Sequence, residues 1–108
     1  MGKGNFRQVV HAGDIPEKDF SCFEVDGVRI VICRFKDEYF ALKNECSHAL
    51  STFEGGRVKG YRLICPLHGA AFDCRDGSPV AAPAIRPITT FPVRVVDGVV
   101  GVDVSVAG

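Results

Sequence analysis

The sequence is poor in several residue types, having no tryptophan, one methionine, two tyrosines and three histidines among 108 residues. No apolar run approaches the length of a membrane-spanning helix, and the N-terminal stretch MGKGNFRQVV lacks the apolar core of a secretory signal. Thirteen basic residues balance thirteen acidic ones, and the charges are spread along the chain. We therefore expect a single domain over residues 1–108, located in the cytoplasm, that binds neither nucleic acid nor a membrane.

Cysteine is better represented, with five residues. An odd number of cysteines without a secretory signal argues against a framework of disulfides and favours free thiols or metal ligands. Which of the five are ligands then depends on what stands beside them in the sequence.

Two Asp-Gly dipeptides, each between runs rich in β-branched residues, predict two antiparallel hairpins. The first joins FSCFEV to VRIVICRF, and the second joins FPVRVV to VVGVDV. A further strand is expected at YFALKN from Tyr39, and shorter ones around 61–64 and 71–74.

Helical periodicity is nearly absent, apart from a short turn expected near AGDIPEKDF. The stretch GSPVAAPAIRP, from Gly77 to Pro87, is predicted to be a long loop because of its glycine and prolines. The glycines of EGG, residues 54–56, indicate a tight turn and not a phosphate-binding loop. The sequence thus predicts an all-β domain whose looped middle third, about 45–84, carries the chemistry.

That chemistry is indicated by two pairs of residues, Cys46 with His48 and Cys65 with His68. Four such residues at these spacings are improbable as ordinary core thiols and surface histidines. Structural zinc is the main rival, although a Cys-x-His opening is uncommon in its binding loops. A Rieske-type [2Fe–2S] cluster requires histidines on one of its two irons, and one cysteine with one histidine in each loop supplies that set.

The stretches CSH at 46–48 and CPLHG at 65–69 resemble the Rieske signature. The flanking FALKNECSH and HGAAFDCRDGSP, and the late VRVVDGVVGV, are similar to the same family. The chain most closely resembles the Rieske ferredoxins of bacterial aromatic-ring dioxygenase systems. That resemblance implies one [2Fe–2S] cluster, with Cys46 and Cys65 on the inner iron and His48 and His68 on the outer iron. The implied Rieske fold consists of stacked antiparallel sheets with a looped cluster-binding subdomain.

The resemblance also implies a function. A monomeric ferredoxin would carry single electrons from a flavin-containing, NAD(P)H-dependent reductase to a terminal ring-hydroxylating oxygenase in aromatic degradation, and would not itself be an enzyme. Respiratory Rieske proteins carry an additional cysteine in each loop, where this chain has Ser51 and Leu67. A quinol-oxidising role is therefore not expected.

Three alternatives to this function differ in their metal or in their partners. The oxygenase itself needs a second iron site with two histidines, but only His11 remains after His48 and His68 are assigned. A zinc-stabilised binding module would be colourless. A Rieske-like small subunit of another oxidoreductase, of the arsenite oxidase or nitrite reductase type, would differ in its partners.

The remaining cysteines and histidine lack ligand spacing. We interpret Cys22, Cys33 and Cys74 as core thiols in strands, with Cys33 the diagonal, same-face neighbour of Cys22 in the first hairpin. His11 is expected to face solvent.

Overall fold

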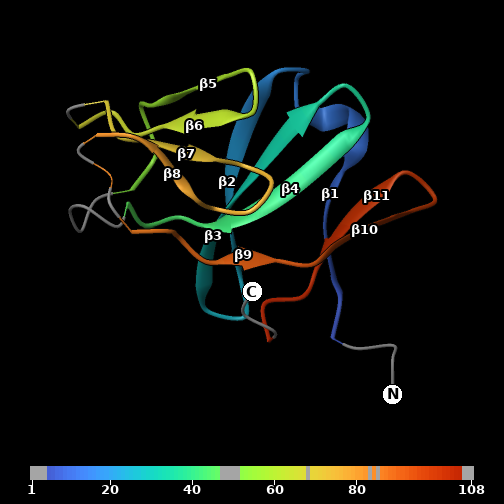
Figure 1. Ribbon diagram of the computed structural model, residues 1–108. Helices are drawn as coiled ribbons and strands as arrows, with labels where there is room; N and C mark the ends of the chain where they lie inside the picture. Colours follow the sequence, from blue (N-terminus) through green and yellow to red (C-terminus); the bar gives the residue numbers. More distant parts are fainter. Residues whose placement is uncertain (1–4, 47–51, 68, 83, 85, 106–108) are drawn as a thin grey trace.

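The computed structural model describes residues 5–46, 52–67, 69–82, 84 and 86–105, which form three antiparallel sheets (Figure 1). The first sheet has the order β1 (Arg7–His11), β11 (Val99–Val102), β10 (Val93–Val96). The second has the order β2 (Asp19–Val25), β3 (Val28–Phe35), β4 (Glu38–Lys43), β9 (Thr90–Phe91). The third has the order β5 (Arg57–Lys59), β6 (Arg62–Ile64), β7 (Ala71–Asp73), β8 (Pro79–Ala81). The all-β prediction is confirmed, and the described residues contain one short 3₁₀ turn, η1 (Ala12–Asp14), where a helical turn was expected.

Both predicted Asp-Gly hairpins are present. Val25 pairs with Val28 across the first turn, whose Asp26 and Gly27 have φ angles of 50° and 81°. The second turn repeats this geometry, because Asp97 and Gly98 have φ angles of 53° and 76°. Positive φ at both central residues matches the right-handed twist of the flanking strands, which fixes the register of each pair.

The prediction for residues 77–87 is wrong in part, because Pro79–Ala81 forms β8 at the edge of the third sheet. Phe72 pairs with Pro79 and Ala71 pairs with Ala81, with a register shift between the two pairs. An edge strand tolerates proline as its first residue, since that position can leave its missing N–H on the unpaired side.

The second sheet lies between the other two and is buried on both faces. Ile30 and Ile32 of β3 belong to a core shared with the first sheet, together with Val100 and Val102. The alternate residues of β3, Val31, Cys33 and Phe35, belong to the core shared with the third sheet. Figure 1 shows the third sheet and the β10–β11 hairpin at opposite ends of the molecule, joined by β2–β4.

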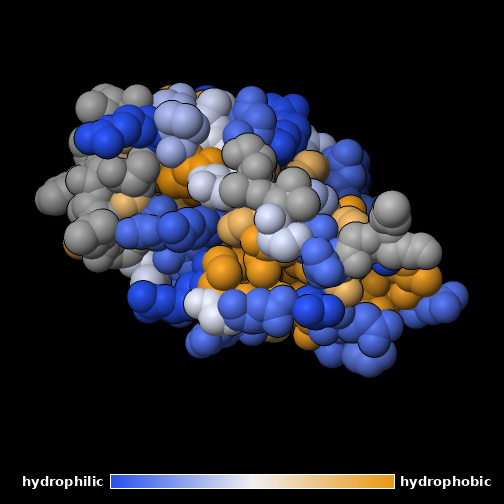
Figure 2. All heavy atoms as spheres, turned by 90° about the horizontal axis from the view of Figure 1, so that it is seen from below, coloured by the Kyte–Doolittle hydropathy of each residue, from blue (hydrophilic) through white to orange (hydrophobic). Residues whose placement is uncertain are grey.

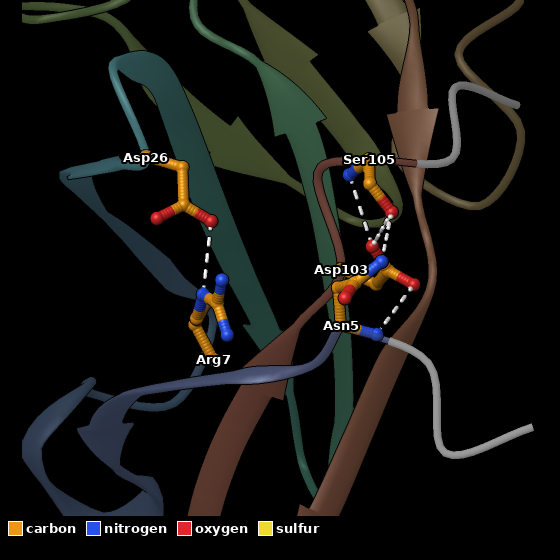
Figure 3. Close-up of polar contacts among 5 residues, drawn as sticks. All are labelled: Asn5, Arg7, Asp26, Asp103 and Ser105. Atoms are coloured by element: carbon orange, nitrogen blue, oxygen red, sulfur yellow. Dashed lines mark hydrogen bonds and ion pairs between the residues drawn. The ribbon is translucent and has the colours of Figure 1, made fainter.

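The start of the described chain is bound to its end by polar contacts (Figure 3). The Asn5 side chain donates a hydrogen bond to Ser105 Oγ (3.1 Å), and Ser105 N–H donates to Asp103 Oδ1 (2.9 Å). The Ser105 hydroxyl is the main reason that the pKa of Asp103 lies below its ordinary value. Arg7 Nε also lies 3.0 Å from Asp26 Oδ2. Of these contacts, the Arg7–Asp26 pair links the first sheet to the β2–β3 turn of the second.

The surface is mostly polar, with some apolar side chains exposed. Figure 2 shows apolar side chains in the middle of one face and at the end where the β10–β11 hairpin lies. In that hairpin Val95 and Val96 are 45% and 51% exposed. Within the described part of the chain, no helix has the length and hydrophobicity to cross a membrane.

Candidate metal centre

Two of the four predicted ligands, Cys46 and Cys65, lie in one apolar core. Cys46 comes three residues after β4 ends, and Cys65 directly follows β6. Each is 1% exposed, and both belong to the core between the second and third sheets. The other two predicted ligands, His48 and His68, lie outside the described residues.

The side chain of Asn44 links the two ends of the segment that contains Cys46 and His48. Asn44 is 4% exposed, and its Oδ1 accepts a hydrogen bond of 2.7 Å from the backbone N–H of Phe53. The backbone N–H of Asn44 donates to the carbonyl oxygen of Arg29 at 2.9 Å. Asn44 therefore fixes both ends of the first loop to β3.

The second loop is closed by its own backbone. Cys65 N–H donates a hydrogen bond of 2.7 Å to the carbonyl oxygen of Ala70, and Gly69 has a φ of 72°. Ala70 is fully buried beneath this turn. A residue with a side chain at Gly69 would be strained, because only glycine adopts this conformation readily.

The two loops pack against each other at Gly56. A Cβ placed on Gly56 would lie 2.1 Å from the carbonyl oxygen of Ile64 and 3.2 Å from Cδ of Pro66. Gly56 N–H also donates to the carbonyl oxygen of Phe53 (2.8 Å), which forms the tight turn predicted for residues 54–56. Only a glycine allows the second loop to approach this turn so closely.

A third loop borders the same core. Ile88 N–H donates to the carbonyl oxygen of Gly77 (2.9 Å), and this bond closes the segment that contains β8. Ala84 from this segment is 8% exposed and belongs to the same core as Cys46 and Cys65. Pro83 of this segment lies outside the described residues.

The prediction that the other three cysteines are core thiols in strands holds for Cys33 on β3, whereas Cys74 is buried in the turn after β7 and Cys22 on β2 is only partly buried. Cys33 and Cys74 are buried, and their Sγ atoms lie 3.4 Å apart in a thiol hydrogen bond that raises the pKa of Cys33. The register of β2 with β3 confirms that Cys33 is the diagonal neighbour of Cys22. Cys22 is half-buried, and its pKa is raised to about 11 by burial and by the neighbouring Glu54. No sequence pattern indicates the Cys33–Cys74 contact, because 41 residues separate the two.

The surroundings of Cys46 and Cys65 match the charge of a Rieske cluster. The core that holds them is apolar. Among the described residues the buried polar ones are Asn44 and Asp103, and Asp103 directly follows β11 in the first sheet. Two ferric ions, two sulfides, two thiolates and two neutral imidazoles would make an oxidised cluster that is formally neutral, so an apolar site does not penalise it. Among the described residues no three histidine, cysteine or carboxylate side chains gather as a metal site, and the predicted ligands His48 and His68 lie outside those residues.

Residues 5–92 match the family model described as the Rieske [2Fe-2S] domain. The chain belongs to this family. It is 40% identical to the anthranilate 1,2-dioxygenase ferredoxin subunit of Burkholderia cepacia over 70% of each chain. His11, the histidine outside the motif, is exposed, as predicted.

Solved structures of Rieske ferredoxins have the same fold as the chain. The ferredoxin of carbazole 1,9a-dioxygenase from Nocardioides aromaticivorans IC177 superposes with a TM-score of 0.89 and 28% identity, covering 93% of this chain and 98% of that one. A structure titled as the complex of reduced oxygenase and oxidised ferredoxin in carbazole 1,9a-dioxygenase matches with a TM-score of 0.86 and 27% identity, covering 91% and 92%. The match over nearly the full length of both chains confirms the Rieske fold.

Proposed function

We propose that this Rieske protein is an electron-transfer ferredoxin of an aromatic-ring-hydroxylating dioxygenase system. It takes single electrons from an NAD(P)H-dependent flavoprotein reductase and delivers them to the terminal oxygenase. The observation that carries the proposal is the near-complete mutual coverage with a dioxygenase ferredoxin, which leaves no part of the chain for a second catalytic centre. The chain is accordingly a carrier and not an enzyme.

The proposed ligands of one [2Fe–2S] cluster are Cys46, His48, Cys65 and His68. A cluster held by these residues would supply one-electron chemistry. The burial of both thiols in one apolar core supports the assignment of the cysteines, and the two motifs supply the histidines. The cluster-binding subdomain, about residues 45–84, corresponds to the third sheet with its flanking loops.

The residues of the chain contribute rigidity to this site. The Asn44–Phe53 bond, the Cys65–Ala70 bond and the contact at Gly56 anchor the described ends of the two loops. Anchored ends limit the rearrangement that would oppose electron transfer. Phe53 and Phe72, with ring centroids 5.8 Å apart, fill the core beneath the loops.

The potential is expected at the lower end of the Rieske range of about −150 to +300 mV. Leu67 stands where respiratory Rieske proteins have a cysteine of the loop disulfide, and its side chain is 42% exposed. A low potential suits a carrier that receives electrons from reduced flavin. The carrier is proposed to act as a cytoplasmic monomer.

Metal analysis, spectroscopy and reconstitution together test the proposal. Purified protein should contain two irons and two inorganic sulfides per chain and give an EPR signal of low average g after reduction. It should also support NADH-dependent hydroxylation when combined with the reductase and terminal oxygenase of its own system. One zinc per chain with no sulfide would contradict the cluster, and a correct cluster without any transfer to the oxygenase would contradict the function.

A further inference from the structure

The outer face of the third sheet carries a basic groove, defined by the lining residues Arg57, Lys59, Gly60, Arg62, Ile64, Gly69, Ala71 and Ala81. Its volume is about 580 Å³, and the residues that line it include three cationic side chains and no carboxylate. The overall charge of zero does not indicate this concentration of positive charge, although the three cations lie within six consecutive residues, RVKGYR at 57–62.

The pairing of short strands produces the groove. Lys59 pairs with Arg62, and Arg57 pairs with Ile64, so the three cations and the isoleucine share one face. The alternate residues Leu63 and Phe72 are fully buried on the opposite face. Ile64 pairs with Ala71, which in turn pairs with Ala81, and this row forms an apolar floor beside the cations.

The positive charge of the groove is only partly offset within the sheet, where the pKa of Asp73 is lowered mainly by Arg75 and to a minor extent by the charge of Arg62. The carboxylate on the same face belongs to Asp73, which pairs with Arg62 across β6 and β7. Arg75 already binds both carboxylate oxygens of Asp73, with Nε 3.0 Å from Oδ1 and the terminal nitrogen Nη2 2.7 Å from Oδ2. Among the described residues, no ion pair involves Arg57, Lys59 or Arg62.

The groove lies next to the proposed cluster loops in the chain. Ile64 directly precedes Cys65, and Gly69 directly follows His68. On the other side of Gly60, a second hollow is lined by Lys18, Phe35, Lys36 and Tyr61. Glu38 lies beside this second hollow and accepts a hydrogen bond from the Tyr61 hydroxyl (2.5 Å), so its carboxylate offsets part of the positive charge there.

We propose that the basic groove is the docking surface for a carboxylate-rich surface of a redox-partner protein. The inference rests on the proposed function, because it assigns a partner contact to an electron carrier. Charge complementarity selects this occupant, since three cations that form no ion pair within the described part of the chain surround an apolar floor, where they attract carboxylates and still allow close packing. Attraction at this position speeds encounter with the partner and places the partner beside the cluster loops.

Stopped-flow kinetics with matched variants tests the groove. The test protein is the cluster-loaded double variant Lys59→Glu/Arg62→Glu, and the matched control is Arg7→Glu/Arg94→Glu. Arg7 on β1 and Arg94 on β10 are exposed and belong to the first sheet, away from the groove. Both variants change the net charge equally. Each is measured for reduction by the reductase and for oxidation by the terminal oxygenase of its own system, at several salt concentrations.

We expect the groove variant to lower the second-order rate constant with at least one partner by about tenfold or more at low salt. Its rate should also lose most of its dependence on ionic strength, whereas the control should change less than about threefold. Equal rates for the groove variant and the wild type would overturn the proposal while leaving the ferredoxin function intact. Equal losses in both variants would overturn it as well, because only net charge would then matter.

Other occupants of the groove give distinct results. Sodium benzoate is titrated into the wild type by calorimetry. Saturable binding, together with transfer rates that the variants leave unchanged, would assign the groove to a small organic acid and overturn the proposal. The wild type could also associate with itself, and the groove variant could abolish that association without changing the transfer rates. This result would assign the groove to a second copy of the chain and would also overturn the proposal. Failure of the wild type to exchange electrons with either partner would instead overturn the proposed function and the docking surface together.

Discussion

Asn44 Oδ1 accepts a hydrogen bond of 2.7 Å from the backbone N–H of Phe53, and this bond joins the two ends of the segment that contains Cys46 and His48. Both residues are buried, so neither the amide oxygen nor the N–H has water as a substitute partner. A buried donor that loses its acceptor costs about 1–3 kcal/mol. The stability of the first loop therefore depends on one side chain that is not itself a proposed ligand.

Asn44→Ala is expected to keep the fold but to hold the cluster less firmly. The free energy of unfolding should fall by about 1–3 kcal/mol, and loss of the cluster absorption in the presence of an iron chelator should become faster. Asn5→Ala is the matched control, because the Asn5 side chain bonds Ser105 at an exposed place on the first sheet. Equal cluster lifetimes in the two variants would show that Asn44 does not stabilise the loop.

The pH dependence of thiol alkylation tests the environment of Cys22. Its pKa is raised to about 11, first by burial and then by Glu54, which disfavour the thiolate. At pH 8 the reactive thiolate fraction is then about a hundredfold lower than for an ordinary cysteine. The rate of reaction with iodoacetamide, followed by mass spectrometry, should therefore still rise above pH 10.

Removing the carboxylate next to Cys22 should lower the thiol pKa. Glu54→Gln deletes a negative charge beside the thiol, so the thiolate forms at lower pH and alkylation at pH 8 becomes faster. Glu24→Gln is the control, because Glu24 is an exposed residue on the same strand. If Cys22 of the wild type reacts at pH 8 as fast as a free thiol does, its pKa is not raised.

Gly56→Ala tests the contact between the two loops. A Cβ at this position would lie 2.1 Å from a backbone oxygen, which cannot move away as a flexible side chain would. We expect a loss of stability of about 3 kcal/mol or more and less iron per chain. Gly13→Ala is the control, since a Cβ on Gly13 meets no atom within 4 Å. Iron analysis and thermal unfolding measure both effects, and full occupancy in Gly56→Ala would show that the loops need not touch.

The sequence predicted those parts of the fold that depend on local chemistry. Asp26-Gly27 and Asp97-Gly98 specify hairpins because positive φ at two successive residues is costly for most residue types. By contrast, β5 was missed because it is three residues long and two of them, Arg57 and Lys59, are charged. Its only apolar residue is Val58, which is too little for a periodic pattern. β8 was missed because proline and alanine indicate a loop, and only its pairing with β7 makes it a strand.

The candidate site was predictable only as a set of ligand residues. Cys46 and Cys65 stand out through their spacing from histidines, which is a local property of the sequence. The side chain of Asn44 and the close approach at Gly56 depend on partners nine and eight residues away, in folded loops whose geometry no pattern reveals. The basic groove is a mixed case: its three cations lie close together in the sequence at 57–62, but only the pairing of β5 with β6 puts them on one face.

Leu67→Asp tests whether electrons leave through the loop that carries Cys65 and His68. Leu67 is 42% exposed, and an apolar side chain beside the proposed ligands offers a contact surface that both partners need. A carboxylate at this position would be desolvated in each complex, so reduction by the reductase and oxidation by the oxygenase should each slow by about tenfold. Val96→Asp is the matched control, because Val96 is an apolar residue 51% exposed on β10 in the first sheet. Both half-reactions are measured by stopped-flow on variants whose cluster spectrum is intact. Slower transfer in Val96→Asp with unchanged transfer in Leu67→Asp would show that electrons leave at the first sheet instead.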